Sequence, residues 1–215
     1  RRHVDAINSL NVFPVPDGDT GTNMYGTLEG IQTRMRTVEY ADLRELTDLL
    51  SQAALYEGRG NSGIILSQIF RGLAEYLSVH TSEIDLEIIS GAIGNARVKA
   101  FDSVAEPTEG TMLTVLSDVA NRADSLKGKE ISLKNLFKLL VEEAQRSVDR
   151  TPELLPILKD SGVVDSGGYG IEVILEGMAI FLTDTDPATV PIMLRRPDGD
   201  GTGVENLISD HFGSE

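Results

Sequence analysis

Apolar residues recur at helical spacing along most of the chain. The pattern is clearest at positions 43–54, 64–77 and 133–144, where leucine, isoleucine and alanine return every three or four residues. That is the period of a helix with one buried face. Further helices are predicted over residues 24–36, 86–101, 111–123 and 169–182. No segment shows the sustained alternation of a half-buried strand, so the pattern predicts an all-α fold.

Polar, glycine-rich connections separate the predicted helices. Glycine permits positive φ and close approach of the backbone, so such loops are where a ligand can meet unpaired amides. The connections lie at residues 14–23, 58–63, 106–110 and 160–168. We therefore expect a binding site to be built from them.

The composition changes near residue 184. Beyond it the chain contains Asp-Pro, Arg-Arg-Pro and an Asp-Gly-Asp-Gly-Thr-Gly run with little apolar support. We expect a helical domain over residues 1–183, followed by a linker or tail over 184–215 that leads to another domain. The chain opens without Met inside an amphipathic segment, so we also expect a fragment whose N-terminal helix is truncated.

The charge balance limits the possible partners. There are 34 acidic and 19 basic residues, a formal net charge of −15. This argues against a nucleic-acid partner, and it means that a site for ATP would need divalent cations to invert the local field. The absence of cysteine excludes disulfides, thiolate nucleophiles and thiolate-bound metals. With no membrane span or signal peptide in the sequence, we expect a cytoplasmic protein.

The loop before position 24 carries the strongest candidate chemistry. Pro14 and Pro16 stiffen its approach, and Asp17 and Asp19 follow two residues apart. Two carboxylates at that spacing can face one point and suit Mg²⁺, which takes its remaining ligands from water and phosphates. A helix start then offers amides and hydroxyls to an anion. These groups belong to Thr20, Gly21, Thr22 and Asn23.

Two other interpretations of this loop stand beside the metal site. One is an ordinary Asp-Gly turn followed by a helix N-cap. The other is a calcium loop of EF-hand type, which fails because the twelfth position counted from Asp17 is Leu28, where a bidentate Glu is needed. Fourteen residues of unusual composition favour a functional loop over a simple turn.

Four segments resemble one known family. They are LNVFPVPDGDTGTNM at 10–24, GRGNSGIILSQ at 58–68, PTEGTMLT at 107–114 and VVDSGGYG at 163–170. Together they resemble the N-terminal domain of bacterial fatty acid kinase, the FakA family, which is similar to the DhaL-type nucleotide-binding subunit of dihydroxyacetone kinases. The resemblance implies an antiparallel barrel of about eight helices, with ATP or ADP lying across the loops at one end.

The resemblance also implies a metal site. DhaL-type domains use three aspartates, and two have clear counterparts here, Asp17 and Asp19, which would hold one or two Mg²⁺ ions. The third position falls near Asn11, where the spacing differs by one residue. Asn11 would offer a neutral oxygen or a water contact. Thr20 stands where dihydroxyacetone kinases carry His, so an imidazole has no role there.

The other loops have a structural and a functional interpretation each. Residues 58–63 match Gly-x-Gly-x-x-Gly, but a helix precedes them and not a strand, so dinucleotide binding of Rossmann type is rejected. Asn61 or Ser62 caps a helix or, by resemblance, binds phosphate. Without the resemblance, Met112 would be interpreted as a core residue and Asp165 as a helix cap. By resemblance, the segment beside base and ribose is Gly110, Thr111 and Met112, and the residues closing over the nucleotide are Asp165 and Gly167.

Three functions remain in competition. The first is the ATP-binding domain of a fatty acid kinase that forms an acyl phosphate on a carrier-bound fatty acid. If catalysis requires a downstream domain, this chain would be inactive alone, and other domains would form any homo-oligomer. The second is a dihydroxyacetone-type kinase subunit, against which Thr20 argues. The third is a nucleotide-sensing module without catalysis. No P-loop is present, so the metal would supply the charge that a lysine supplies elsewhere.

Overall fold

The computed structural model describes residues 1–80 and 84–183, and within them every regular element is a helix. The expected linker at 184–215 lies outside the described residues. The helices are α1 (Val4–Ser9), α2 (Thr20–Arg36), α3 (Leu43–Glu57), α4 (Gly60–Ser78), α5 (Leu86–Asp102), α6 (Met112–Ser125), α7 (Leu133–Leu154), α8 (Pro156–Asp160) and α9 (Ser166–Leu182). The predicted all-α class is confirmed.

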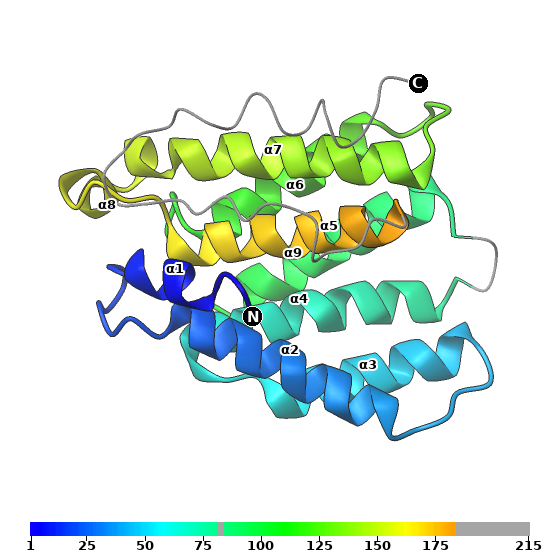
Figure 1. Cartoon of the computed structure of the whole chain (residues 1–215). Coiled ribbons are helices and arrows are strands. Elements are labelled where there is room, and N and C mark those ends of the chain that lie inside the picture. The colour runs from blue at the N-terminus through cyan, green and yellow to red at the C-terminus, as the bar shows by residue number, and fades with distance from the viewer. Residues whose placement is uncertain (81–83, 184–215) are drawn as a thin grey trace.

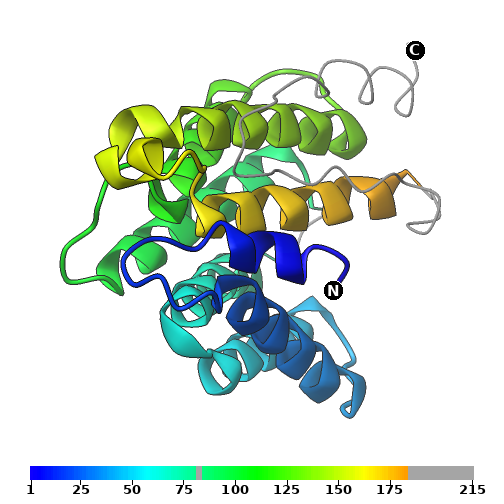
Figure 2. The ribbon, with the colours of Figure 1, turned by 60° about the vertical axis from the view of Figure 1, so that its left-hand side comes forward.

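The long helices form a closed ring. Each of α2 to α7 packs on its neighbour in sequence, α7 packs on α9, and α9 returns to α2. Successive helices run in opposite directions, and the short α1 and α8 lie at the same end as the starts of α2 and α9 (Figures 1 and 2). This is the antiparallel helical barrel that the resemblance implied.

Two buried clusters hold the ring together. The larger gathers apolar side chains of α4 to α7 and α9, with Tyr169, Leu66 and Leu140 among its fully buried members. The smaller joins α2 to α3 through Ile31, Ala53 and Ala54. Burial of such side chains contributes roughly 1.5–3 kcal/mol each for the larger ones. The apolar stripes seen in the sequence therefore face these clusters.

Short polar side chains start several helices. Asp42, Asp85 and Ser132 each accept a hydrogen bond from a backbone amide in the first turn of α3, α5 and α7, respectively. Such N-caps pair amides that have no partner within the helix. Two helices begin earlier than predicted, α2 at Thr20 and α9 at Ser166, because their first turns contain glycine and small polar residues that carry no apolar period.

The end of α7 is fastened to the start of α9. Pro152 lies inside α7 and has no N–H to donate to the carbonyl of Val148. The hydroxyl of Thr151 donates to that carbonyl instead, at 2.7 Å, and accepts from the amide of Asp165 at 3.0 Å. A proline that would disturb an isolated helix is therefore compensated by its neighbour, and this neighbour also positions the loop that begins α9.

Candidate functional site

The starts of α2, α4, α6 and α9 meet at one end of the barrel. Ser62 at the start of α4 donates to the carbonyl of Thr20 at 3.4 Å, and Ser166 of α9 donates to the Thr20 hydroxyl at 3.2 Å. Met112, the first residue of α6, packs against Gly167 so closely that a Cβ there would lie 3.1 Å from its sulfur. The loops singled out in the sequence are thus brought together, with several helix N-termini converging on one region.

The Asp17–Asp19 loop stands directly before α2. Asp17 is exposed and Asp19 is half-buried, and Gly18 between them has φ +66°, a conformation that favours glycine. Asp19 occupies the N-cap position of α2, but its side chain makes no capping hydrogen bond. The Asp19 carboxylate is therefore not used to cap its own helix. The Asp17 carboxylate has a partner, because its Oδ1 accepts from Asn11 Nδ2 at 2.7 Å.

The first turn of α2 is partly committed to α1. Gly21 is buried against it, and a Cβ there would lie 2.4 Å from the carbonyl oxygen of Val4. Thr22 donates its amide to Asn8 Oδ1 at 3.1 Å, and its hydroxyl accepts from Asn8 Nδ2 at 2.9 Å. Of the residues predicted to face an anion, Thr22 already has both groups paired, which the sequence did not indicate.

The start of α4 lies against α2. Gly60 has φ +55° and lies beside the side-chain amide of Asn23. A Cβ at position 60 would be only 2.2 Å from Asn23 Nδ2. The amide of the preceding residue, Arg59, donates to the hydroxyl of Thr27 at 3.1 Å. Asn61 is exposed, and Ser62 is half-buried through its contact with Thr20. Glycine at position 60 is therefore required both by its φ and by the close approach of α2.

Asp165 joins the starts of α6 and α9. Its Oδ2 accepts from the amide of Gly168 at 2.7 Å, and the amide of Met112 also donates to the carboxylate. Burial raises the pKa of the Asp165 carboxyl from its usual 3.8 to about 7, although these two amide hydrogen bonds oppose the rise. Asp165 is thus a buried cap that links two helices.

The segment before α6 is held by its own polar groups. Gly110 has φ +79° and donates its amide to the hydroxyl of Thr114 at 2.9 Å. Thr111 caps α6, and its hydroxyl donates to the carbonyl of Thr108 at 2.8 Å. Met112 is only 4% exposed and belongs to the larger core cluster. The side chain of Met112 is thus packed in the core, and its contact with the nucleotide base remains a prediction.

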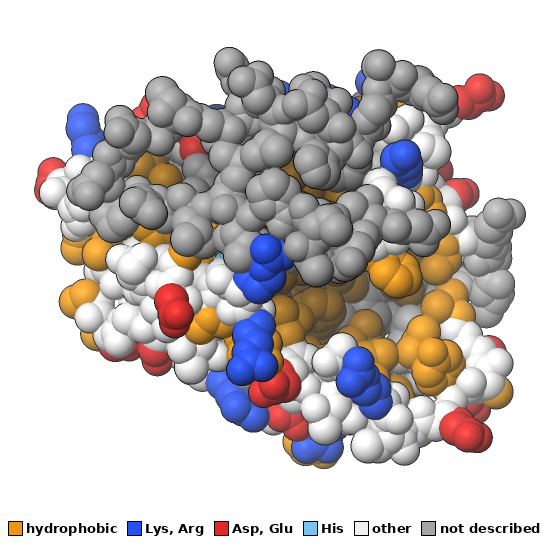
Figure 3. Space-filling view, in the orientation of Figure 1, with side chains coloured by type: hydrophobic (Ala, Val, Ile, Leu, Met, Phe, Trp, Pro, Cys, Tyr) orange, Lys and Arg blue, Asp and Glu red, His pale blue; other side chains and the backbone are white. Residues whose placement is uncertain are grey.

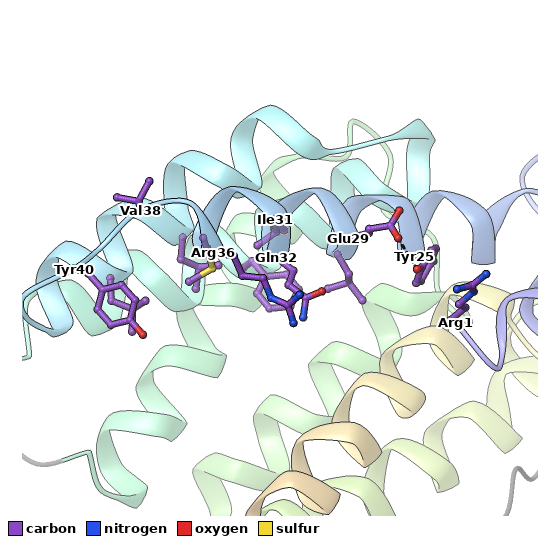
Figure 4. Close-up of a pocket in the computed structure, with 13 residues that line it drawn as sticks. Arg1, Tyr25, Glu29, Ile31, Gln32, Arg36, Val38 and Tyr40 are labelled. Atoms are coloured by element: carbon purple, nitrogen blue, oxygen red, sulfur yellow. Dashed lines mark hydrogen bonds between the residues drawn. The ribbon is translucent and has the colours of Figure 1, made fainter. Parts of the chain in front are cut away.

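A cavity of about 810 Å³ lies elsewhere, along α2, and none of the predicted site residues lines it. Figure 4 shows Arg1 and Tyr25 at one end and Val38 and Tyr40 at the other. Tyr25 donates to Glu29 at 2.6 Å at its rim. Hydrophobic side chains also gather in a hollow on the face of the molecule shown in Figure 3. No sequence pattern singled out this cavity.

Within residues 1–80 and 84–183, no three His, Asp or Glu side chains gather closely enough to form a metal cluster. Asp17 and Asp19 therefore lack a third acidic partner in the described chain, and a Mg²⁺ ion there would take its other ligands from phosphate and water.

Among the same residues, none of the helices combines the length and the apolar character that a membrane span requires.

Comparison with known proteins identifies the family. The family model of the DAK2 domain matches residues 14–180, which include all four converging helix starts. The chain belongs to the DAK2 domain family. This family is related to dihydroxyacetone kinases, and its DhaL-type domains bind ADP or ATP.

Similar proteins occur in several bacteria. Protein YloV of Bacillus subtilis is 42% identical over 190 residues, covering 88% of this chain and 34% of YloV. Protein MG369 of Mycoplasma genitalium is 38% identical over 208 residues, covering 91% of this chain and 37% of that protein. A Staphylococcus saprophyticus protein, SSP1546, is 39% identical over 175 residues, 81% of this chain and 32% of the relative. The chain spans about a third of the length of these relatives.

Proposed function

We propose that this DAK2 domain binds ATP with Mg²⁺ and serves as the nucleotide-binding domain of a cytoplasmic fatty acid kinase. The acceptor would be a fatty-acid carboxylate presented by a separate carrier protein, and the product an acyl phosphate. The observation that carries the proposal is the position of Asp17 and Asp19, directly before α2 at the point where α4, α6 and α9 also begin.

In this proposal Asp17 and Asp19 bind the metal, and the helix starts bind the phosphates. Mg²⁺, when bound with ATP, would neutralise charge on the β- and γ-phosphates. The backbone amides of Thr20 and Gly21 in α2, together with the first-turn amides of α4, would donate to phosphate oxygens, with the Ser62 hydroxyl beside them. Asp165 would keep the starts of α6 and α9 together next to the nucleotide. The role of this chain is then to position charge, not to exchange protons.

The absence of an evident general base in the loops supports the choice of a carboxylate acceptor. A carboxylate is ionised near neutral pH and needs no general base, whereas a hydroxyl acceptor does. Thr20 stands where dihydroxyacetone kinases carry His. Transfer to a fatty acid loaded on its carrier therefore supports the fatty acid kinase, transfer to a small keto-alcohol supports the dihydroxyacetone-type enzyme, and nucleotide binding without either indicates a sensing module.

Calorimetric titration of ATP tests the binding half of the proposal. We expect tight binding only with Mg²⁺. In the Asp17→Ala/Asp19→Ala variant we expect the affinity to fall by at least about 100-fold, because losing even an outer partner of a metal ligand costs about 10- to 100-fold. Glu39→Ala/Asp48→Ala is the matched control, since it removes two exposed carboxylates from another part of the surface. Equal binding with and without Mg²⁺, or equal losses in both double variants, would contradict the proposal.

A further inference from the structure

Asn11 lies at the centre of a buried hydrogen-bond network beside the candidate metal loop. It is 7% exposed. Its Nδ2 donates to Asp17 Oδ1 at 2.7 Å and to the carbonyl of Val15 at 3.0 Å. Its Oδ1 accepts from the hydroxyls of Thr20 at 2.5 Å and Ser166 at 3.4 Å. Both ends of the amide are therefore in use.

The surroundings determine which way the amide points. On one side are a carboxylate oxygen of Asp17 and the carbonyl oxygen of Val15, and both are placed as hydrogen-bond acceptors. On the other side are two hydroxyls, which can donate. A flipped amide would set its oxygen against two acceptors, so the Nδ2 atom must face Asp17.

We propose that Asn11 is a positioning residue for Asp17 and not a third metal ligand. The proposal rests on the function proposed above and refines its metal site. The Asn11 Nδ2 holds Asp17 Oδ1 in place, which leaves Oδ2 as the oxygen of that carboxylate to face the cation. The Asn11 oxygen already accepts from hydroxyls of two different helices. Asn11 would therefore act as an outer partner, which orients the metal-binding carboxylate of Asp17 without touching the metal itself.

Ser166 extends this role to another part of the chain. It is 3% exposed and lies in the first turn of α9, next to the cap residue Asp165. Its hydroxyl reaches both Asn11 and Thr20, at 3.4 and 3.2 Å. The orientation of Asp17 at the start of α2 therefore depends on where α9 begins, so the two helix starts form one unit.

The Asn11→Asp variant separates the two roles. If Asn11 were a ligand, a carboxylate would strengthen the site and recreate the three aspartates of DhaL-type domains. If Asn11 instead positions Asp17, the variant loses the Nδ2 donor, and the new carboxylate faces the Asp17 carboxylate at hydrogen-bond distance. We expect the Mg²⁺ concentration for half-maximal ATP binding to rise by about tenfold, within the range for outer-shell partners of metal ligands.

Ser166→Ala provides a second test, because alanine cannot bind a metal and leaves Asn11 in place. We expect the same Mg²⁺ midpoint to rise by about two- to fivefold, as for loss of one hydrogen bond, with ATP affinity at saturating Mg²⁺ nearly unchanged. The matched control is Ser90→Ala, since Ser90 is 3% exposed and its hydroxyl has no hydrogen-bond partner in the described chain.

The outcomes distinguish this inference from the function beneath it. A wild-type protein that does not bind ATP with Mg²⁺ defeats both. A wild-type protein that does bind, together with a lower Mg²⁺ midpoint in Asn11→Asp, defeats the inference alone. Equal midpoints in Ser166→Ala and Ser90→Ala also defeat it, even where Asn11→Asp fails to fold. Thermal denaturation without metal shows whether each variant is folded.

Discussion

The starts of α2 and α9 contain similar residues in different environments. In both, aspartate is followed by small polar residues and glycine, as Asp-Thr-Gly from Asp19 and Asp-Ser-Gly from Asp165. Asp165 is 5% exposed and caps α9 through the amide of Gly168. Asp19 is half-buried and, although it is the N-cap residue of α2, makes no capping hydrogen bond.

This difference shows that the same residue types can serve opposite purposes. A buried carboxylate that caps its helix accepts hydrogen bonds from backbone amides and is shielded from ligands. One that stays out of the cap keeps its oxygens for a cation. The α9 start is therefore the structural member of the pair, and the α2 start is the proposed binding member; the two are joined through Ser166 and Thr20.

The largest effect is expected from removing the buried charge of Asp165. Its folded-state pKa, about 7, is above its ordinary 3.8, so the native state holds an extra proton between these values. The stability that Asp165 contributes is thus fully present below about pH 4 and is lost as pH rises to about 7. The Asp165→Asn variant does not undergo this loss. As pH rises from 4 to 7, its free energy of unfolding should therefore increase relative to that of the wild type, by on the order of a few kcal/mol.

Urea denaturation of both proteins from pH 4 to pH 8 measures this gain. Asn retains an oxygen to cap α9, so the cap itself is preserved. Asp42→Asn is the matched control, because Asp42 caps α3 in the same manner but is exposed. Parallel pH profiles of wild type and Asp165→Asn would show that burial of the carboxyl does not distinguish the two helix starts.

A smaller effect is expected at the α2 start, from Gly21→Ala. The new Cβ would lie 2.4 Å from the carbonyl oxygen of Val4 and 3.0 Å from the Cβ of Ile7, so α1 must move. We expect the free energy of unfolding to fall by about 1–3 kcal/mol. Gly177→Ala in α9 is the control, because its Cβ meets nothing within 4 Å.

The control should stabilise the protein by about 0.5–1 kcal/mol, as alanine does in a helix interior. Urea denaturation at neutral pH compares the two variants. A Gly21→Ala protein as stable as Gly177→Ala would mean that the contact between α1 and α2 is not needed to form the binding member of the pair.

The smallest effect is expected beside the binding member, from Arg59→Gln. Arg59 is the one Lys or Arg within residues 14–24, 58–63, 106–113 and 163–170. Its side chain is 58% exposed and lies 3.9 Å from Glu57, which also pairs with Arg34. An exposed cation near a phosphate contributes about 1 kcal/mol, so ATP affinity should fall about fivefold.

Calorimetry in low salt measures this loss most clearly, since salt screens exposed charges. Arg44→Gln removes the same charge from an exposed position on α3 and is the control. If Arg44→Gln weakens ATP binding as much as Arg59→Gln, the loss of affinity comes from the change in net charge and not from the position of Arg59 at the start of α4.

Much of the fold could be predicted because the helix period is local. The stripes over residues 43–54, 64–77 and 133–144 became α3, α4 and α7. The starts of α2 and α9 were missed by three to four residues, since Thr20 and Ser166 begin helices without an apolar residue. The cavity along α2 was not predicted at all, because it depends on how α2, α3 and α4 pack.

The candidate site could be predicted by residue type and only partly by role. The sequence singled out Asp17, Asp19, Asn11 and Asp165 as polar residues in glycine-rich loops. It could not show that Asn11 is occupied by Ser166, a residue 155 positions away. The predicted ligand role of Asn11 remains a prediction, against which the positioning role is now proposed.

By itself, the sequence determined the helices and the loops that join them, because spacing and glycine content act over a few residues. Only the tertiary structure decided which aspartate is buried and which has no capping hydrogen bond. The reason is that a carboxylate's environment includes groups brought from distant parts of the chain, as the backbone amide of Met112 is brought to Asp165.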